Sequence, residues 1–135
     1  MSYKLIDIKG IGEATAETLA AHGLKTTEDF LAAAASKKGR DTLAAATGLP
    51  YDKILRWANM ADLFRIKGVA EEYSNLLEKA GVDTVKELRN RVPANLQAKM
   101  EEVNGQIHLV QRVPTLAEVT NWVDHAKELE PMMTY

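Results

Sequence analysis

The chain has 135 residues, of which 46% are hydrophobic and 27% charged, so it is long enough and apolar enough to bury the core of a globular protein. It contains no cysteine, which excludes disulfides, thiolate catalysis, zinc ribbons and iron–sulfur clusters. The net charge of −2 gives no general attraction for nucleic acid, and neither a signal-peptide pattern nor a membrane-spanning apolar stretch occurs, so we expect a cytoplasmic protein without membrane contact.

The first predicted element is a glycine turn that leads into a helix. The turn spans residues 10–12, and small or apolar residues then recur at helical spacing up to Leu19. Gly23 follows at the place of a left-handed helix C-cap. We interpret the turn as a tight corner that Cβ atoms would block, with the apolar residue between the glycines filling the space between two helices.

Capping signals divide the rest of the first half into helices. Residues 26–29 have the spacing of a loose capping box. The basic stretch "SKKGRDTL", residues 36–43, is expected to form a loop between helices. Pro50 stands at the expected first position of a helix that carries Trp57.

The second half repeats the first. Seven residues recur unchanged 58 positions later, so that Ile8, Lys9, Gly10, Glu13, Leu19, Gly23 and Thr26 become Ile66, Lys67, Gly68, Glu71, Leu77, Gly81 and Thr84. After an insertion of seven residues, Trp57 lines up with Trp122. Internal repeats decide architecture, so we expect two equivalent halves that each end in a tryptophan-bearing helix.

The remaining signals in the second half are also helical. Residues 84–87 and 115–118 have capping-box spacing, and the last helix is expected to run through Leu129. Residues 107–113 are the only β-prone run, and they have no partner of a similar kind. The sequence therefore predicts an all-α fold of eight to ten short helices, with halves 1–65 and 66–135 packed as one compact domain.

The turns carry a family resemblance. The first turn has the pattern apolar residue, any residue, glycine, apolar residue, glycine, and a helix with small residues follows it. This pattern resembles the helix-hairpin-helix motif of DNA repair and recombination proteins. From about Ile6 to Leu129 the chain is similar to a bacterial family of unassigned function built of tandem helix-hairpin-helix repeats, within the SAM-like all-α folds. This resemblance implies two pseudo-repeated helix-hairpin-helix units and brings no catalytic residues with it.

The turns and one basic stretch are the candidate phosphate or DNA contacts, because backbone amides at a helix start can bind a phosphate oxygen. The candidates are Lys9, Gly10, Ile11 and Gly12 in the first turn, Lys67, Gly68, Val69 and Ala70 in the second, and Lys37, Lys38 and Arg40 in the basic stretch. The alternative is that all these lysines and arginines are simply solvated. Glu13 and Glu71 follow the turns and would oppose a phosphate, and alanine at position 70 suggests a less open second turn.

Catalytic patterns are absent from the sequence. His22, His108 and His125 are far apart, without metal-ligand spacing, and neighbouring acidic residues point away from each other on helices. We expect no enzyme activity, metal, cofactor or small-molecule substrate. Trp57 and Trp122 are expected as core anchors, with base stacking as the alternative.

The expected function is that of a non-enzymatic adaptor or scaffold that contacts a protein partner or a second copy of itself. Sequence-non-specific binding of duplex DNA through the turn amides, Lys9 and Lys67 is the alternative. An accessory or lyase role of the kind found among DNA-repair enzymes is a second alternative, for which no supporting site is visible.

Overall fold

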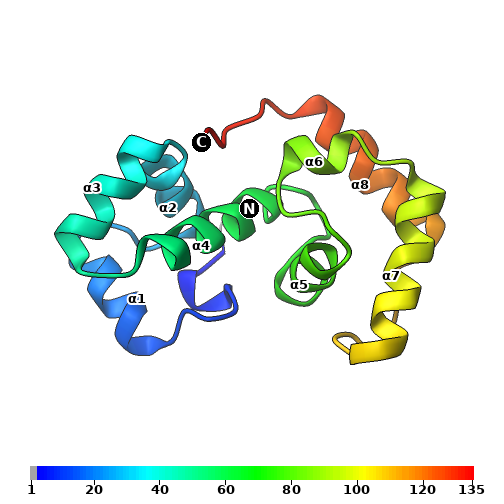
Figure 1. Ribbon diagram of the computed structural model, residues 1–135, viewed down its shortest axis with the longest axis horizontal. Coiled ribbons are helices and arrows are strands. Elements are labelled where there is room, and N and C mark those ends of the chain that lie inside the picture. Colours follow the sequence, from blue (N-terminus) through cyan, green and yellow to red (C-terminus); the bar gives the residue numbers. More distant parts are fainter. Residues whose placement is uncertain (1–2) are drawn as a thin grey trace.

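The computed structural model describes residues 3–135, which form eight α-helices and one short 3-10 helix (Figure 1). Their bounds are η1 Leu5–Asp7, α1 Glu13–Ala20, α2 Thr27–Ala34, α3 Lys37–Thr47, α4 Tyr51–Leu63, α5 Glu71–Lys79, α6 Val85–Arg89, α7 Pro93–Ile107 and α8 Leu116–Glu128. Within this part of the chain the only β-type pairing is an isolated bridge between Lys4 and Thr26. The predicted all-α class is therefore confirmed.

Threonine side chains start the helices where the sequence predicted caps. Thr26 accepts a hydrogen bond from the amide of Asp29 at 3.1 Å, and the Asp29 carboxylate accepts one from the Thr26 amide, which makes a full capping box. Thr84 accepts from the Glu87 amide at 3.1 Å, without the reciprocal bond. Pro50 is the N-cap of α4, one position before the place predicted for it.

Helix α4 lies in the middle of the molecule, with α1, α2 and α3 to one side and α5 to α8 to the other (Figure 1). Two groups of buried apolar side chains follow this division, one built from η1 to α4 and one from the end of α4 to α8. Leu63 belongs to the second group and the next residue, Phe64, to the first. The end of α4 thus joins both cores.

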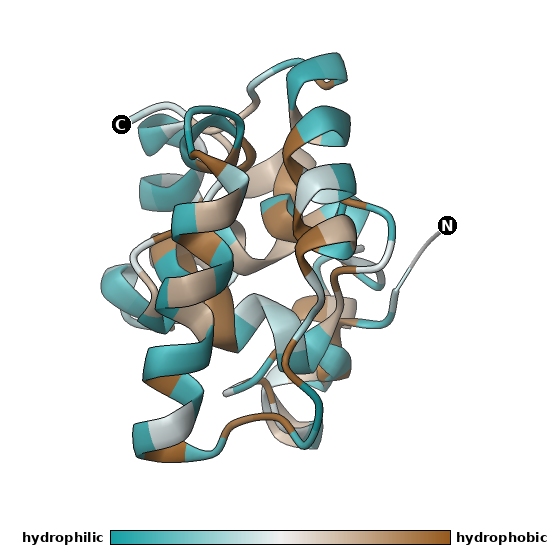
Figure 2. Cartoon of the chain, turned by 90° about the vertical axis from the view of Figure 1, so that its right-hand side faces the viewer, coloured by the Kyte–Doolittle hydropathy of each residue, from teal (hydrophilic) through white to brown (hydrophobic). Residues whose placement is uncertain are grey.

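Helices α7 and α8 close the second core from outside. Figure 2, which looks onto this side of the molecule, shows hydrophobic residues alternating with hydrophilic ones along the helices. Leu96 and Met100 of α7 and Val119 and Val123 of α8 are buried there. None of the helices in residues 3–135 combines the length and apolar character that crossing a bilayer requires.

The chain after α8 returns to the first core. Met133 is buried among side chains of the first half, and the amide of Thr134 donates to the carbonyl of Ala35 at 2.8 Å. In Figure 1 this last segment runs from α8 back toward α2. The C-terminal residues therefore fasten the second half to the first.

Both α1 and α5 end in the same way. Leu24 N donates to Leu19 O at 3.0 Å, and Val82 N donates to Leu77 O at 2.8 Å. The residue before each donor is a glycine with positive φ, as predicted for Gly23. This six-to-one hydrogen bond is the Schellman type of helix ending, which leads the chain directly into the next helix.

Candidate interaction surfaces

The two glycine turns have the same internal structure. In each turn the apolar residue after the glycine is buried, and its amide donates to the carbonyl three residues earlier. The bonds run from Ile11 N to Ile8 O at 3.1 Å and from Val69 N to Ile66 O at 3.0 Å. Because these amides are already bonded, Ile11 and Val69 hold the turns together and do not offer a donor to a phosphate.

The helix after each turn begins without a side-chain cap. The N-cap residues are Gly12 for α1 and Ala70 for α5, both with extended backbone. A Cβ atom built on Gly12 would meet nothing within 4 Å, so this place accepts alanine as readily as glycine. The expectation that alanine at position 70 makes the second turn less open stays a prediction. Neither N-cap amide has an acceptor within residues 3–135.

Carboxylates stand beside these open amides. Glu13 lies in the first turn of α1, and Glu71 and Glu72 lie in the first turn of α5, all exposed. The positive end of the helix dipole favours negative charge at this position. The glutamate carboxylates therefore already make the electrostatic interaction that a bound phosphate would make. Lys9 and Lys67 are exposed in the turns themselves.

The arginines closest to the turns are engaged in internal contacts. Arg56 of α4 donates to the carbonyl of Lys9 at 3.0 Å and forms an ion pair with Glu78 of α5 at 3.0 Å. Arg65 pairs with the buried carboxylate of Asp62 at 2.7 Å. Arg56 thus connects the first turn to the second half, a role that the sequence pattern did not indicate.

Residues 36–43 do not form the predicted loop. Ser36 is the N-cap of α3, and its hydroxyl accepts from the amide of Gly39 at 3.0 Å. Gly39 lies inside the helix, where a Cβ atom would collide with the carbonyl oxygen of Ala33. Lys37 pairs with Asp41 one turn later at 2.8 Å, and both side chains are exposed. The basic residues are therefore on a helix start, packed closely on the end of α2.

Arg40 is not a surface residue, in contrast to its predicted place in a phosphate-binding group. Its side chain is fully buried. The guanidinium donates to the Tyr51 hydroxyl at 3.1 Å, to the carbonyls of Ala34 and Ala35 at 3.0 Å each, and to the carbonyl of Thr134 at 2.6 Å. Arg40 therefore binds the C-terminal segment to the first half. Lys38, by contrast, is exposed.

A cavity of about 480 Å³ lies beside the second turn. Its lining residues come from the turn and from α8 and are Lys67, Gly68, Glu118, Asn121, Trp122 and His125. The amide of Lys67 donates to Nδ1 of His125 at 3.1 Å, so the neutral ring carries its proton on Nε2. Lysine, asparagine, histidine and indole nitrogens make this cavity rich in hydrogen-bond donors.

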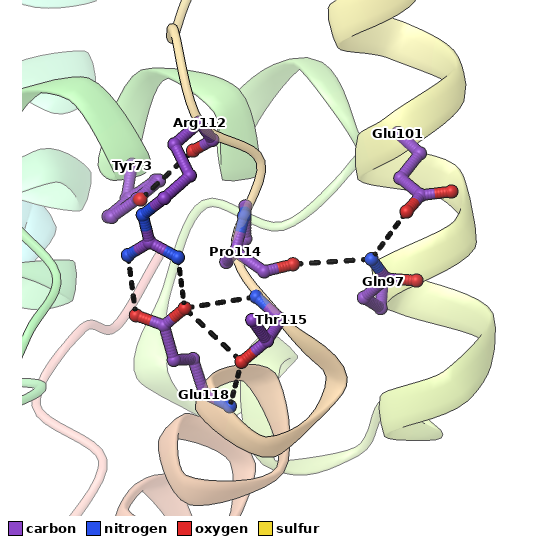
Figure 3. Close-up of polar contacts among 7 residues, drawn as sticks. All are labelled: Tyr73, Gln97, Glu101, Arg112, Pro114, Thr115 and Glu118. Carbon is purple, nitrogen blue, oxygen red and sulfur yellow. Dashed lines mark hydrogen bonds and ion pairs between the residues drawn. The ribbon is translucent and has the colours of Figure 1, made fainter.

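One wall of this cavity carries an ion pair. Figure 3 shows that Arg112 binds the carboxylate of Glu118 with two hydrogen bonds, of 2.7 and 3.0 Å. Glu118 also completes the capping box of α8 with Thr115. The Arg112 guanidinium, followed by the Thr115 amide, lowers the pKa of Glu118 to about 2. The carboxylate is therefore ionised at neutral pH, and Arg112 balances its charge.

A groove of about 520 Å³ lies beside α1, which we call the α1 groove. Its lining residues are Lys4, Leu5, Ile6, Glu13, Ala16, Glu17, Ala20 and Lys25. The floor is apolar and includes Ile6, whose side chain is 43% exposed. Its acidic lining residues all belong to α1, which we call the acidic bank, and its basic lining residues belong to the segments before and after α1, which we call the basic bank.

The equivalent face of α5 is covered by the chain itself. Ser74 and Leu76 of α5 are buried, whereas the matching Ala16 and Thr18 of α1 are partly exposed. Helix α7 packs against α5, and the Tyr73 hydroxyl donates to the carbonyl of Arg112 at 3.0 Å in the segment that follows α7. The first half has no such segment, because only residues 48–50 connect α3 to α4.

The remaining residues that the sequence suggested for chemistry lie apart in the structure or in the core. Trp57 and Trp122 are both 3% exposed, which places them in the two cores. No group of three or more histidine, aspartate or glutamate side chains in residues 3–135 is arranged to hold a metal ion.

Comparison with known proteins identifies the family of the chain. The family model described as "Domain of unknown function (DUF4332)" matches residues 9–129. No curated protein and no solved structure matches the chain.

Proposed function

The chain belongs to the DUF4332 domain family, and on that premise we propose that it is a non-enzymatic adaptor or scaffold, built of two helix-hairpin-helix units, that binds a protein partner. The proposal of two equivalent units is supported by matching details. In each half, a glycine with positive φ is followed by a buried apolar residue, and the amide of that apolar residue donates to the carbonyl three residues earlier. The helix that follows each turn has a Schellman ending.

The α1 groove is the observation that carries the choice of a protein partner. In the second half the matching helix face is covered by α7 and the segment after it, whereas in the first half it is open to solvent. An apolar floor between charged banks is the usual composition of a protein contact, with a dry centre and a polar rim. The engagement of Arg56, Arg65 and Arg40 in internal bonds also removes positive charge from a surface for nucleic acid.

The test uses a photo-crosslinking amino acid in place of Ala20, which lines the groove, in cells that naturally contain the protein. The matched control places the same group at Ala45, an exposed alanine of α3. We expect a discrete protein adduct from position 20 and none from position 45. The absence of any adduct at position 20, or the same adducts from both positions, would contradict the proposal.

A second candidate function is contact with a DNA phosphate at the second turn. It is favoured by the cavity beside Lys67, where donors from the turn and from α8 meet, and by the open amides at the start of α5. Binding of duplex DNA in about 50 mM salt should then weaken steeply as salt rises. It should be lost in a Lys9→Glu/Lys67→Glu variant and kept in a Lys53→Glu/Lys86→Glu control, which changes two exposed lysines away from the candidate contacts. Failure of the unmodified protein to bind duplex, branched or single-stranded DNA would exclude this candidate.

A further inference from the structure

We propose that the α1 groove is the contact between two copies of this chain, related by a twofold axis. The inference rests on the proposed function, because it assigns the protein partner of that surface. It is carried by the distribution of charge on the two banks of the groove, by the open α1 face, and by what covers the matching face of α5.

The two banks have opposite charges in equal number. Glu13 and Glu17 stand one helical turn apart on α1, and Lys4 and Lys25 stand on the opposite bank. Lys4 and Lys25 are neighbours because the bridge between Lys4 and Thr26 brings their segments together. Among the ion pairs within residues 3–135, none includes any of these four side chains. No ion pair therefore takes up these charges, although Lys25 lies near Asp29 and helps to lower the pKa of that carboxyl.

A twofold axis that runs along the groove would place each acidic bank opposite the basic bank of the second copy. A symmetric interface uses the same patch on both subunits, so the patch must complement itself, and a bank of each sign on either side of an apolar floor meets this condition. A partner of uniform charge would instead be attracted to one bank and repelled by the other. The second copy is the occupant that satisfies both banks.

The floor of the groove permits close approach. Ala16 and Ala20 present only methyl groups, and the exposed side chain of Ile6 stands beside them. In the second half, the chain supplies its own cover for this face, with apolar side chains of α7 and the segment after it. Within residues 3–65 the first half supplies no such cover, so a second copy would supply there what α7 and the segment after it supply to α5.

Two charge-reversed variants test the proposal. The first is Glu13→Lys/Glu17→Lys, which makes both banks basic, and the second is Lys4→Glu/Lys25→Glu, which makes both acidic. We expect the unmodified protein to dimerise reversibly in sedimentation equilibrium at about 50 mM salt, with weaker association at high salt because the banks are exposed. Each variant alone should dimerise at least about tenfold more weakly, and an equimolar mixture of the two should regain association as a heterodimer.

Folding and charge have separate controls. Circular dichroism of each variant shows whether α1 is intact, and the mixture serves as an internal check because misfolded chains would not recover association. Lys38→Glu/Lys86→Glu changes the net charge as much as the acidic variant does, away from the groove, and should leave dimerisation unchanged.

The outcomes also separate this inference from the proposed function. A monomer at all concentrations up to about 0.5 mM, or a mixture that stays monomeric, would overturn the second-copy assignment. If position 20 then still crosslinks to a different protein, the adaptor function stands with another partner. If the chain is monomeric and position 20 crosslinks to nothing, both proposals fall.

Discussion

Gly10 lies directly against the indole nitrogen of Trp57, so closely that a Cβ atom on Gly10 would be 3.1 Å from Nε1. The same relationship recurs in the second half, where a Cβ atom on Gly68 would be 3.2 Å from Nε1 of Trp122. Both glycines have positive φ, +101° and +91°. Glycine is therefore required at each turn for two reasons, the backbone conformation and the close tryptophan.

Alanine at these turns should destabilise the fold. For Gly10→Ala and Gly68→Ala we expect a loss of about 1–3 kcal/mol in the free energy of unfolding, measured by urea denaturation, from left-handed strain together with displacement of the indole. Gly12→Ala is the matched control, and its effect should stay within about 0.5 kcal/mol because its φ is negative and no atom is near. Equal losses at positions 10 and 12 would contradict this explanation of the turn.

Arg40 should be one of the most sensitive polar positions in the chain. Arg40→Leu removes a fully buried guanidinium, leaves the carbonyls of Ala34 and Thr134 without its hydrogen bonds, and leaves Ala35 with only the amide of Thr134 as donor. We expect a loss of about 3 kcal/mol or more in unfolding free energy and faster proteolysis of the segment after α8. Lys38→Leu, on the exposed side of the same helix, should change neither. Unchanged proteolysis in Arg40→Leu would show that the segment is held by other contacts.

The environment of Arg40 could not be predicted from its neighbours in the sequence. Local patterns predicted the helices and caps, because a threonine cap or a C-terminal glycine acts within a few residues. The partners of Arg40 include Thr134, 94 positions later in the chain, and no spacing rule reports such a contact. Three basic residues within a stretch of eight therefore predict an exposed basic group. In the structure, however, Arg40 is the centre of a buried hydrogen-bond network.

The sequence predicted the candidate surfaces only in part, because local patterns locate turns and do not report which segments cover them. The repeat located both turns, and the residues at their centres lie where a buried plug was expected. The α1 groove was not predicted, since it depends on the absence of a covering segment in one half and its presence in the other. The sequence did contain one signal for this difference between the halves, the insertion of seven residues before Trp122. Additional chain in only one half indicates that a surface is covered in that half and not in the other.

The Glu118 carboxylate should make stability depend on pH. Its pKa is about 2 in the folded protein against an ordinary value of 4.5, mainly because of Arg112, so its contribution is complete above about pH 4.5 and is lost as pH falls toward 2. The pair is partly exposed, so we expect Glu118→Gln to cost only about 1 kcal/mol at pH 7. The difference from the unmodified protein should shrink as pH falls through about 2 and vanish below it. Glu128→Gln, at the other end of α8, should show no such pH-dependent difference.

Asp62 should connect the two halves energetically. Its carboxylate is 1% exposed and accepts hydrogen bonds from the amide of Val85 at the start of α6, at 2.8 Å, and from Arg65 at 2.7 Å. Asp62→Ala leaves the buried amide without an acceptor and Arg65 without its partner, so we expect a loss of about 3–5 kcal/mol in unfolding free energy.

The double variant Asp62→Ala/Arg65→Met removes both charges and separates the two causes. If the unpaired charge of Arg65 dominates, the double variant should be more stable than Asp62→Ala alone, by about 1 kcal/mol or more. If the orphaned amide of Val85 dominates, the two variants should have equal stability and α6 should lose protection from hydrogen exchange. A single variant as stable as the unmodified protein would show that α4 and α6 are held together by apolar packing alone, without help from this carboxylate.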